Sequence, residues 1–352
     1  MAATDHPYKS LESRAFWRAA VAEKSPFDIS ELYRKKFAIT PRDKISTAGS
    51  CFAQHIGRRL KASGFRYVDL EPGPGLLPRA RRADFGYGIF SARYGNIYTT
   101  RQLLQLFLRA FGEFKPSDDI WMRDGRYYDA FRPTIEKNGF ASKDELLRAR
   151  DHTFAMVRRI FSNSHVFVFT LGLTEAWVSR EDDSVYPVCP GVEAGSFDPD
   201  RHEFRNFKFI EIESDLQNLM DRAKAINPGL RFLLTVSPVP LTATASGQHV
   251  LLATTHSKSV LRSVAGELAA RNDFVDYFPS YEIITAAPMR SMFFDPNLRS
   301  VNPAGVDLVM RHFFQQHPPS GEARPIRAHV SRKPTDEDVV CDEGKLEKWS
   351  IG

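Results

Sequence analysis

The sequence has few cysteines, no long apolar run and little excess of charge of either sign. Its three cysteines, Cys51, Cys189 and Cys341, are odd in number and far apart, which argues against a disulfide framework and favours a reducing compartment. No run of about 18 apolar residues occurs, and the N-terminal stretch has no apolar core of a signal peptide. We therefore expect a soluble, cytoplasmic protein without a membrane span.

Motifs for common cofactors and for nucleic acid are also missing. The net charge of +5 comes from 48 basic and 43 acidic residues, and no basic stripe alternates with stacking aromatic residues, which argues against nucleic acid as a partner. No Cys-x-x-Cys, His-Glu-x-x-His or aspartate cluster indicates a metal, and residues 85–90 lack the lysine and spacing of a nucleotide-binding loop. We expect no cofactor and no metal, and the sequence leaves the oligomeric state open.

What is present is an alternation of short apolar runs with longer helical patterns. This alternation is typical of an α/β protein, here a three-layer α/β/α sandwich with a mostly parallel central sheet. The predicted strands are residues 44–49, 66–70, 165–172, 231–237 and 273–280. The predicted helices are residues 52–63, 99–113, 143–162, 212–226, 255–271 and 303–316.

The punctuation of the chain predicts three parts. A helical extension covers residues 1–43, the α/β domain covers 44–317 with an insertion at about 71–140, and a polar tail covers 318–352. The insertion contains IWMRDGRYYDAF, residues 120–131, whose Asp124-Gly125 pair favours a tight hairpin turn. Its Trp121, Tyr127 and Tyr128 are candidate surfaces on which a sugar ring could stack.

The stretch ISTAGSCFAQHIGRRL, residues 45–60, places Ser50 and Cys51 between a strand and a helix. A nucleophile at such a turn suits acyl transfer, because the helix N-terminus favours a thiolate and offers N–H groups to an oxyanion. The same residues also fit a plain helix cap with a buried structural cysteine. Both interpretations stay open on the residues alone.

Five stretches in order resemble the GSCFA domain family, which is similar to the GDSL or SGNH hydrolases. They are AGSCFAQHIG (48–57), FVFTLGLTEAW (167–177), LTVSPVPL (234–241), SKSVLR (257–262) and VDYFPSYEI (275–283). The resemblance covers about residues 44–315 and implies a flavodoxin-like SGNH fold. Laid onto Gly-Asp-Ser, it puts Cys51 in the nucleophile position, with Ser50 as the alternative.

The resemblance also implies an oxyanion hole and a catalytic base. The second block falls on Gly95 with Asn96 beside it, and the third block, Gly-x-Asn, falls on Gly172 and Thr174, where threonine replaces asparagine. The last block, Asp-x-x-His, aligns with residues 297–300, which read Asn-Leu-Arg-Ser and contain neither the acid nor the base.

Another base must then be sought. His249, in a loop after the fourth strand, is preferred over His55 and His256, because loops over strand ends commonly carry catalytic groups. Candidate substrate-binding residues at the strand ends and in the insertion are Glu175, Ser237, Arg299, Trp121 and Tyr128.

These observations predict an SGNH-like ester hydrolase or acyl (acetyl) transferase. The resemblance favours an acylated carbohydrate, or another small ester, as the substrate. The alternative is a catalytically degenerate member of the same fold that binds glycans or serves in assembly, which the missing Asp-x-x-His block supports.

Overall fold

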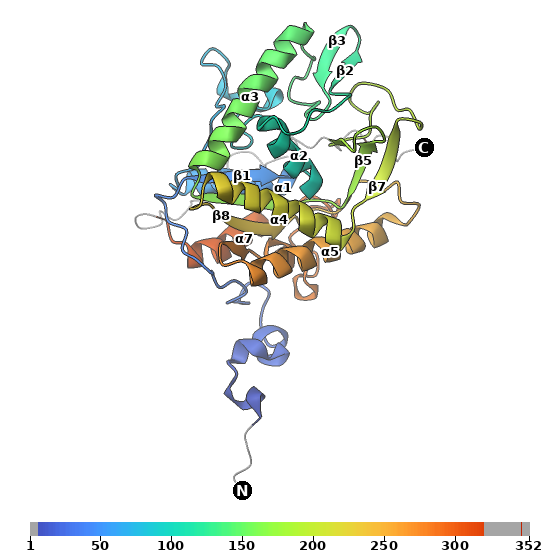
Figure 1. Cartoon of the computed structure of the whole chain (residues 1–352). Coiled ribbons are helices and arrows are strands. Elements are labelled where there is room, and N and C mark those ends of the chain that lie inside the picture. Colours follow the sequence, from blue (N-terminus) through green and yellow to red (C-terminus); the bar gives the residue numbers. More distant parts are fainter. Residues whose placement is uncertain (1–5, 320–345, 347–352) are drawn as a thin grey trace.

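The computed structural model describes residues 6–319 and Leu346. Its centre is a four-stranded parallel sheet in the order β1-β4-β8-β9 (Figure 1). The strands are β1 (Ile45–Gly49), β4 (Val166–Leu171), β8 (Arg231–Val236) and β9 (Val275–Tyr277). Four of the five predicted strands are thus confirmed, although β9 is shorter than the expected 273–280.

Residues 66–70 do not form the predicted strand. They run beside β1 and pair with it only at Ile45, whose N–H donates to the Arg66 carbonyl and whose carbonyl accepts from Val68 N–H, at 3.0 and 2.8 Å. One bridge is too short to count as a strand. The segment nevertheless lies where the second strand of a flavodoxin-like sheet would lie, on the far side of β1 from β4.

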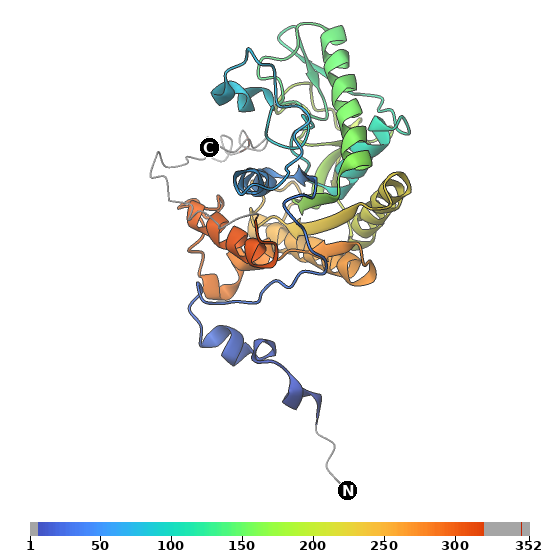
Figure 2. The ribbon, with the colours of Figure 1, turned by 90° about the vertical axis from the view of Figure 1, so that its left-hand side faces the viewer.

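Helices cover both faces of the sheet, as expected for a three-layer sandwich (Figures 1 and 2). Alternate side chains of one strand enter different cores, because successive residues of a strand point to opposite faces. Val166 and Val168 pack with the helices at residues 51–62, 280–285 and 303–316, whereas Phe167 and Phe169 pack with those at 100–110, 143–163, 209–226 and 250–271. The predicted α/β/α architecture is confirmed.

The predicted helices are all present, with shifted ends. Helix α5 begins five residues earlier than expected, because His249 caps it by accepting a hydrogen bond from Leu251 N–H. The bounds are α1 (Cys51–Ala62), α2 (Thr100–Ala110), α3 (Lys143–Asn163), α4 (Phe209–Ile226), α5 (Val250–Arg271), α6 (Ser280–Thr285) and α7 (Pro303–Gln316). Short helical turns lie at η4 (Arg79–Arg81), η5 (Ala83–Phe85) and η6 (Ala287–Met289).

The expected helical extension is only partly helical. Within residues 6–43 it consists of the short turns η1 (Pro7–Ser10), η2 (Ser13–Ala15) and η3 (Arg18–Ala22), which project from the body in Figures 1 and 2, and then of irregular chain. The irregular part packs on the domain: Tyr33 is buried and its hydroxyl donates to Asp276 at 2.9 Å.

Two small antiparallel sheets stand beside the central one. The hairpin of β2 (Ile120–Arg123) and β3 (Arg126–Asp129) confirms the predicted turn, in which Asp124 and Gly125 have φ of 51° and 71°. The second sheet, β5 (Glu175–Ser179), β6 (Val185–Tyr186) and β7 (His202–Asn206), was not anticipated.

Two further sequence predictions concern membrane spans and the C-terminal tail. Within the described part of the chain, no helix is both long and apolar enough to cross a membrane. The predicted polar tail, 318–352, lies outside the described residues except for positions 318, 319 and 346.

Candidate functional site

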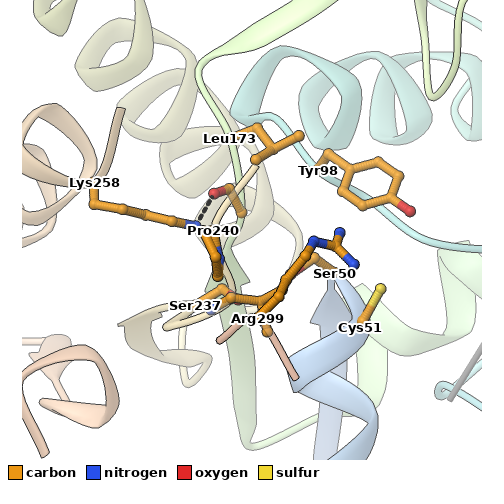
Figure 3. A pocket seen from close by; sticks show the side chains of 10 residues that line it. Ser50, Cys51, Tyr98, Leu173, Ser237, Pro240, Lys258 and Arg299 are labelled. Atoms are coloured by element: carbon orange, nitrogen blue, oxygen red, sulfur yellow. Dashed lines mark hydrogen bonds between the residues drawn. The ribbon is translucent and has the colours of Figure 1, made fainter. Parts of the chain in front are cut away.

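A pocket opens where the central strands end at their carboxyl termini, the edge at which parallel α/β sheets bind ligands (Figure 3). It encloses about 240 Å³, with open solvent at its mouth included. The lining residues come from the ends of β1, β4 and β8, from the segment before α2, from α5 and from the loop before α7. They are Ser50, Cys51, Tyr98, Gly172, Leu173, Ser237, Val239, Pro240, Lys258 and Arg299.

The turn between β1 and α1 has the predicted strand, glycine and helix arrangement. Gly49 adopts φ of +144°, and a Cβ there would lie 2.5 Å from the carbonyl oxygen of Thr170 on the neighbouring strand, so only glycine fits. Ser50 is the N-cap of α1 and Cys51 its first residue. The sharp turn therefore brings both candidate nucleophiles to the pocket.

Ser50 and Cys51 differ in their surroundings. The Ser50 side chain makes no capping hydrogen bond, and its buried hydroxyl has no hydrogen-bond partner. Ser50 also packs against Gly172, where an added Cβ would lie 3.1 Å from that of Ser50. Cys51 is 8% exposed, so its sulfur lies at the inner wall of the pocket.

The wall opposite α1 is the turn that follows β4, and it is held from two sides. The N–H groups of Gly172 and Leu173 both donate to the Tyr98 carbonyl, at 3.2 and 2.9 Å. From α5, Lys258 Nζ donates to the Gly172 carbonyl at 2.6 Å, and Ser257 Oγ accepts from Thr174 N–H at 3.0 Å. These bonds fix the turn against α5, as the dashed line in Figure 3 shows for Lys258.

This hydrogen bonding corrects the expectation that Gly172 and Thr174 form part of an oxyanion hole. Their backbone N–H groups are already donated within the protein. The Thr174 hydroxyl has no partner, but Thr174 is fully buried and does not line the pocket. The turn is therefore a rigid wall of the pocket.

The segment expected to supply Gly95 and Asn96 reaches the site through Tyr98. Asn96 is buried behind α1, where its Oδ1 accepts from Gln54 Nε2 at 3.2 Å and its carbonyl accepts from Gln102 Nε2 at 2.9 Å. Neither Gly95 nor Asn96 lines the pocket, whereas Tyr98 does.

The loop before α7 presents Arg299 where the resemblance led us to look for an acid and a base. Asn297 Oδ1 accepts from the N–H groups of Arg299 and Ser300, both at 2.9 Å, and Asn297 Nδ2 donates to Ser300 Oγ at 3.0 Å. Ser300 occupies the expected histidine position. The loop directs Arg299 into the pocket, so this predicted substrate-binding residue is at the site.

The histidines considered as bases lie elsewhere. His249 is exposed at the N-terminus of α5, where its Nδ1 accepts from Leu251 N–H at 3.1 Å, and it does not line the pocket. His55 lies one turn beyond Cys51, and burial together with the nearby Arg58 and Arg59 lowers its pKa to about 4. Neither is among the lining residues.

Of the predicted binding residues Ser237 and Glu175, only Ser237 lines the pocket. Ser237 lines the pocket; its N–H donates to the Leu171 carbonyl at 2.8 Å and its hydroxyl accepts from Val239 N–H at 3.3 Å. Glu175 opens β5 outside the lining and accepts from Thr244 Oγ1 at 2.9 Å.

Two of the three aromatic residues expected to stack on a sugar, Trp121 and Tyr128, are buried, whereas Tyr127 is half-buried. Trp121 is 3% exposed and packs on Tyr186 with ring centroids 5.1 Å apart, while Tyr128 is 4% exposed and accepts a hydrogen bond from Arg123 at 2.7 Å. Both rings belong to a small hydrophobic core of their own. The expectation that they bind a sugar is wrong, because neither presents a face to a ligand.

Sequence reasoning missed Lys258, Tyr98 and the residues 239 and 240. Lys258 belongs to SKSVLR, one of the five stretches that resemble the family, but this stretch does not indicate by itself which of its side chains enters the pocket. Tyr98 lies two residues beyond the expected Asn96. In the described part of the chain, no group of three or more His, Cys, Asp or Glu residues could hold a metal ion.

Comparisons with known proteins agree with the sequence motifs. The model of the GSCFA family matches residues 44–313. No curated protein matches the chain. A solved structure of a protein assigned as a GDSL-like lipase from Parabacteroides merdae is similar at 13% sequence identity and a TM-score of 0.31, and the match covers 80% of this chain and 98% of that one.

Proposed function

Since the chain belongs to the GSCFA family, we propose that it is an ester hydrolase or acyl transferase in which Cys51 attacks an acyl carbonyl. The observation that carries the proposal is the position of Cys51, at the first residue of α1 and in the wall of the pocket at the strand ends. The alternative nucleophile is Ser50, which lines the same pocket.

The chemistry follows from the position of the sulfur. A thiolate is favoured at a helix N-terminus and beside basic groups, and Lys258 and Arg299 line the same pocket. The sulfur bonds to the acyl carbon while the ester C–O bond breaks, and the released alcohol takes up the proton that the thiol gave. Water, or a sugar hydroxyl in a transferase, then displaces the sulfur from the thioester and restores the thiol.

The developing oxyanion needs donors other than the turn after β4. The first N–H groups of an α-helix have no partner within the helix and point out of its N-terminus. In this chain that terminus is at Ser50 and Cys51, at the pocket. We assign the oxyanion to the N–H groups at the start of α1.

The substrate that fits is an ester with a small acyl group. The pocket offers only about 240 Å³ of space, with the open solvent at its mouth included, which suits an acetyl group and not a long acyl chain. The family resemblance points to an acylated carbohydrate.

The test is the hydrolysis of 4-nitrophenyl acetate by matched variants of the full chain. Cys51→Ala should lower kcat/KM by about 100-fold or more, because it removes the nucleophile, whereas Ser50→Ala should lower it by less than about tenfold. Cys51→Ser controls for the loss of volume. Full activity in Cys51→Ala together with loss in Ser50→Ala would move the reaction to the serine.

A non-catalytic glycan-binding protein is the second candidate. It is favoured by Ser300 in the expected histidine position and by the lack of a histidine among the residues that line the pocket. If the wild-type chain shows no turnover of any aryl acetate but binds acetylated polysaccharide in calorimetry, this candidate replaces the enzyme.

A further inference from the structure

The charge of the pocket is one-sided. Two of its ten lining residues, Lys258 and Arg299, are basic, and none is acidic. They come from different elements, Lys258 from α5 and Arg299 from the loop before α7, and Figure 3 shows both side chains directed to the pocket. A positive lining with protein walls concentrates negative ligands.

Lys258 is held in a fixed place at the base of the pocket. Its side chain is 1% exposed, and its Nζ donates to the Gly172 carbonyl at 2.6 Å. A buried ammonium is costly unless it is hydrogen-bonded, and this bond holds the positive charge at the pocket. The neighbouring Ser257 holds the same turn with a neutral hydroxyl.

Arg299 is presented by a loop of defined conformation. Leu298 has φ of 53°, and Asn297 Oδ1 accepts from the backbone N–H groups of Arg299 and Ser300, so the loop closes around this asparagine. A guanidinium offers a planar set of donors that matches a carboxylate or a phosphate. The position where the resemblance leads one to expect a catalytic histidine, Ser300, is thus directly preceded by a side chain of the pocket that can recognise an anion.

Ser50 adds an independent indication of a ligand. Its side chain is 94% buried, being 6% exposed, and its hydroxyl lines the pocket without a hydrogen-bond partner. Buried polar groups are seldom left in this state, unless a ligand or water completes them. A hydroxyl can donate to an anionic oxygen beside the two cations.

From these three groups we infer that the pocket recognises an anionic group on the substrate, a carboxylate or a phosphate, through Lys258, Arg299 and the Ser50 hydroxyl. The inference rests on the proposed function, which supplies the ester that carries the anion. The protein then selects acidic acylated compounds, such as an acetylated sugar with an acid group, over neutral ones.

Two alkylating reagents of nearly equal size test the charge without any turnover. Iodoacetate is anionic and iodoacetamide is neutral, and both transfer their CH₂ group to the Cys51 sulfur with loss of iodide. The quantity to measure is the rate of Cys51 labelling by iodoacetate divided by the rate by iodoacetamide, determined by peptide mass spectrometry. We expect this ratio to be at least about tenfold higher in the folded full-length chain than in the same chain in urea. A ratio equal to that in urea, or a Cys51 that neither reagent labels, overturns the inference.

Variants assign the effect to the two basic residues. Arg299→Gln and Lys258→Met should each lower the ratio several-fold, whereas Lys258→Arg keeps the charge and should retain it. Arg311→Gln removes an exposed charge of α7 and controls for the change in net charge. If Lys258→Met does not fold, Arg299→Gln alone decides. An unchanged ratio in Arg299→Gln contradicts its role.

Ester pairs separate the inference from the proposed function. We expect kcat/KM for 4-acetoxybenzoate or 4-acetoxyphenyl phosphate to exceed that for 4-acetoxybenzamide by about tenfold or more, and the better of the two anions names the group. Equal turnover of all three esters leaves the enzyme in place and overturns the anion site. If iodoacetate alkylates Cys51 selectively but no ester is turned over, the anion site stands and the proposed enzyme activity is contradicted.

Discussion

Two regions of the molecule hold buried basic side chains, and they differ in what surrounds the charge. Beside the β2–β3 hairpin, Asp129 is 1% exposed and accepts from Arg132 and Arg150 at 2.9 and 3.0 Å. At the pocket, Lys258 donates to a neutral carbonyl and no carboxylate is among the lining residues. In the first region the basic side chains surround a buried carboxylate, whereas in the second they line a pocket.

The difference in energy follows from this contrast. Removing one member of a closed cluster leaves an opposite charge buried without its partner, which is strongly destabilising. Under the proposed anion site, removing the positive charge of Arg299 from the pocket weakens recognition of the substrate more than it weakens the fold. The variants below test whether the two regions really divide in this way.

The largest effect on stability is expected from Asp129→Asn. The change leaves Arg132 and Arg150 buried around a neutral amide, so we expect the free energy of unfolding to fall by about 3–5 kcal/mol in urea titrations. Asp124→Asn is the control, since its carboxylate is exposed at the hairpin turn and asparagine tolerates a positive φ. If both variants stay within about 0.5 kcal/mol of wild type, the cluster does not hold the hairpin.

Ser257→Ala should cost less, because it removes one neutral hydrogen bond from the pocket wall. Thr174 N–H then loses its acceptor in a fully buried place, and we expect a loss of about 1–3 kcal/mol by the same titration. Thr255→Ala, two residues earlier and exposed on α5, should change little. Should the two α5 variants be equally stable, the wall does not depend on this clamp.

Acid titration distinguishes the Asp129 cluster from buried histidines. Burial, with Lys35 and Arg231 nearby, lowers the pKa of His317 to about 4, and its Nδ1 accepts from Ile39 N–H at 3.1 Å. In the unfolded chain the ring takes up a proton near pH 6.5, so stability is complete above that pH and falls as the pH drops towards 4.

Asp129 behaves oppositely, because the nearby Arg150 and Arg132 outweigh its burial and hold its pKa well below the usual range. Its contribution is kept throughout this window and is lost only at lower pH, as the carboxylate is protonated. His317→Gln should therefore flatten the fall in stability between pH 6.5 and 4 by about 1–2 kcal/mol, measured by urea unfolding at several pH values. The exposed His256→Gln should leave the slope as it is. An unaltered slope in His317→Gln would place the titrating group elsewhere.

Periodicity predicted the central layers well, because their signals are local. The strands predicted at β4 and β8 are confirmed, and so is the helix predicted over residues 52–63, on which Phe52, Ile56 and Leu60 lie four residues apart and are all buried. The strand predicted at residues 66–70 is wrong, because this segment pairs with β1 through a single bridge to Ile45. The β5–β7 sheet was missed, because its short strands carry mixed polar and aromatic residues with no clear alternation.

The sequence predicted the pocket residues that lie on one turn, but not the arrangement that depends on tertiary hydrogen bonds. Gly49, Ser50 and Cys51 are contiguous, so their turn could be recognised from the residues. Gly172 N–H donates to the Tyr98 carbonyl, and this bond joins segments that are far apart in the chain. No local sequence pattern predicts such a bond. Lys258 enters the pocket from a helix whose sequence gives no sign of which face meets β4.

The smallest effect on the fold, and the sharpest on reactivity, concerns the two described cysteines. Burial raises the pKa of the Cys189 thiol to about 11, so at pH 8 iodoacetamide should label it about 100-fold more slowly than an ordinary thiol. Cys51, beside basic groups at a helix N-terminus, should be labelled faster than Cys189 at every pH below 10. In urea the two rates should converge. Both thiols react with the same reagent in the same solution, so the comparison isolates their surroundings. Faster labelling of Cys189 than of Cys51 in the folded chain would mean that the basic groups at the pocket do not activate the Cys51 sulfur.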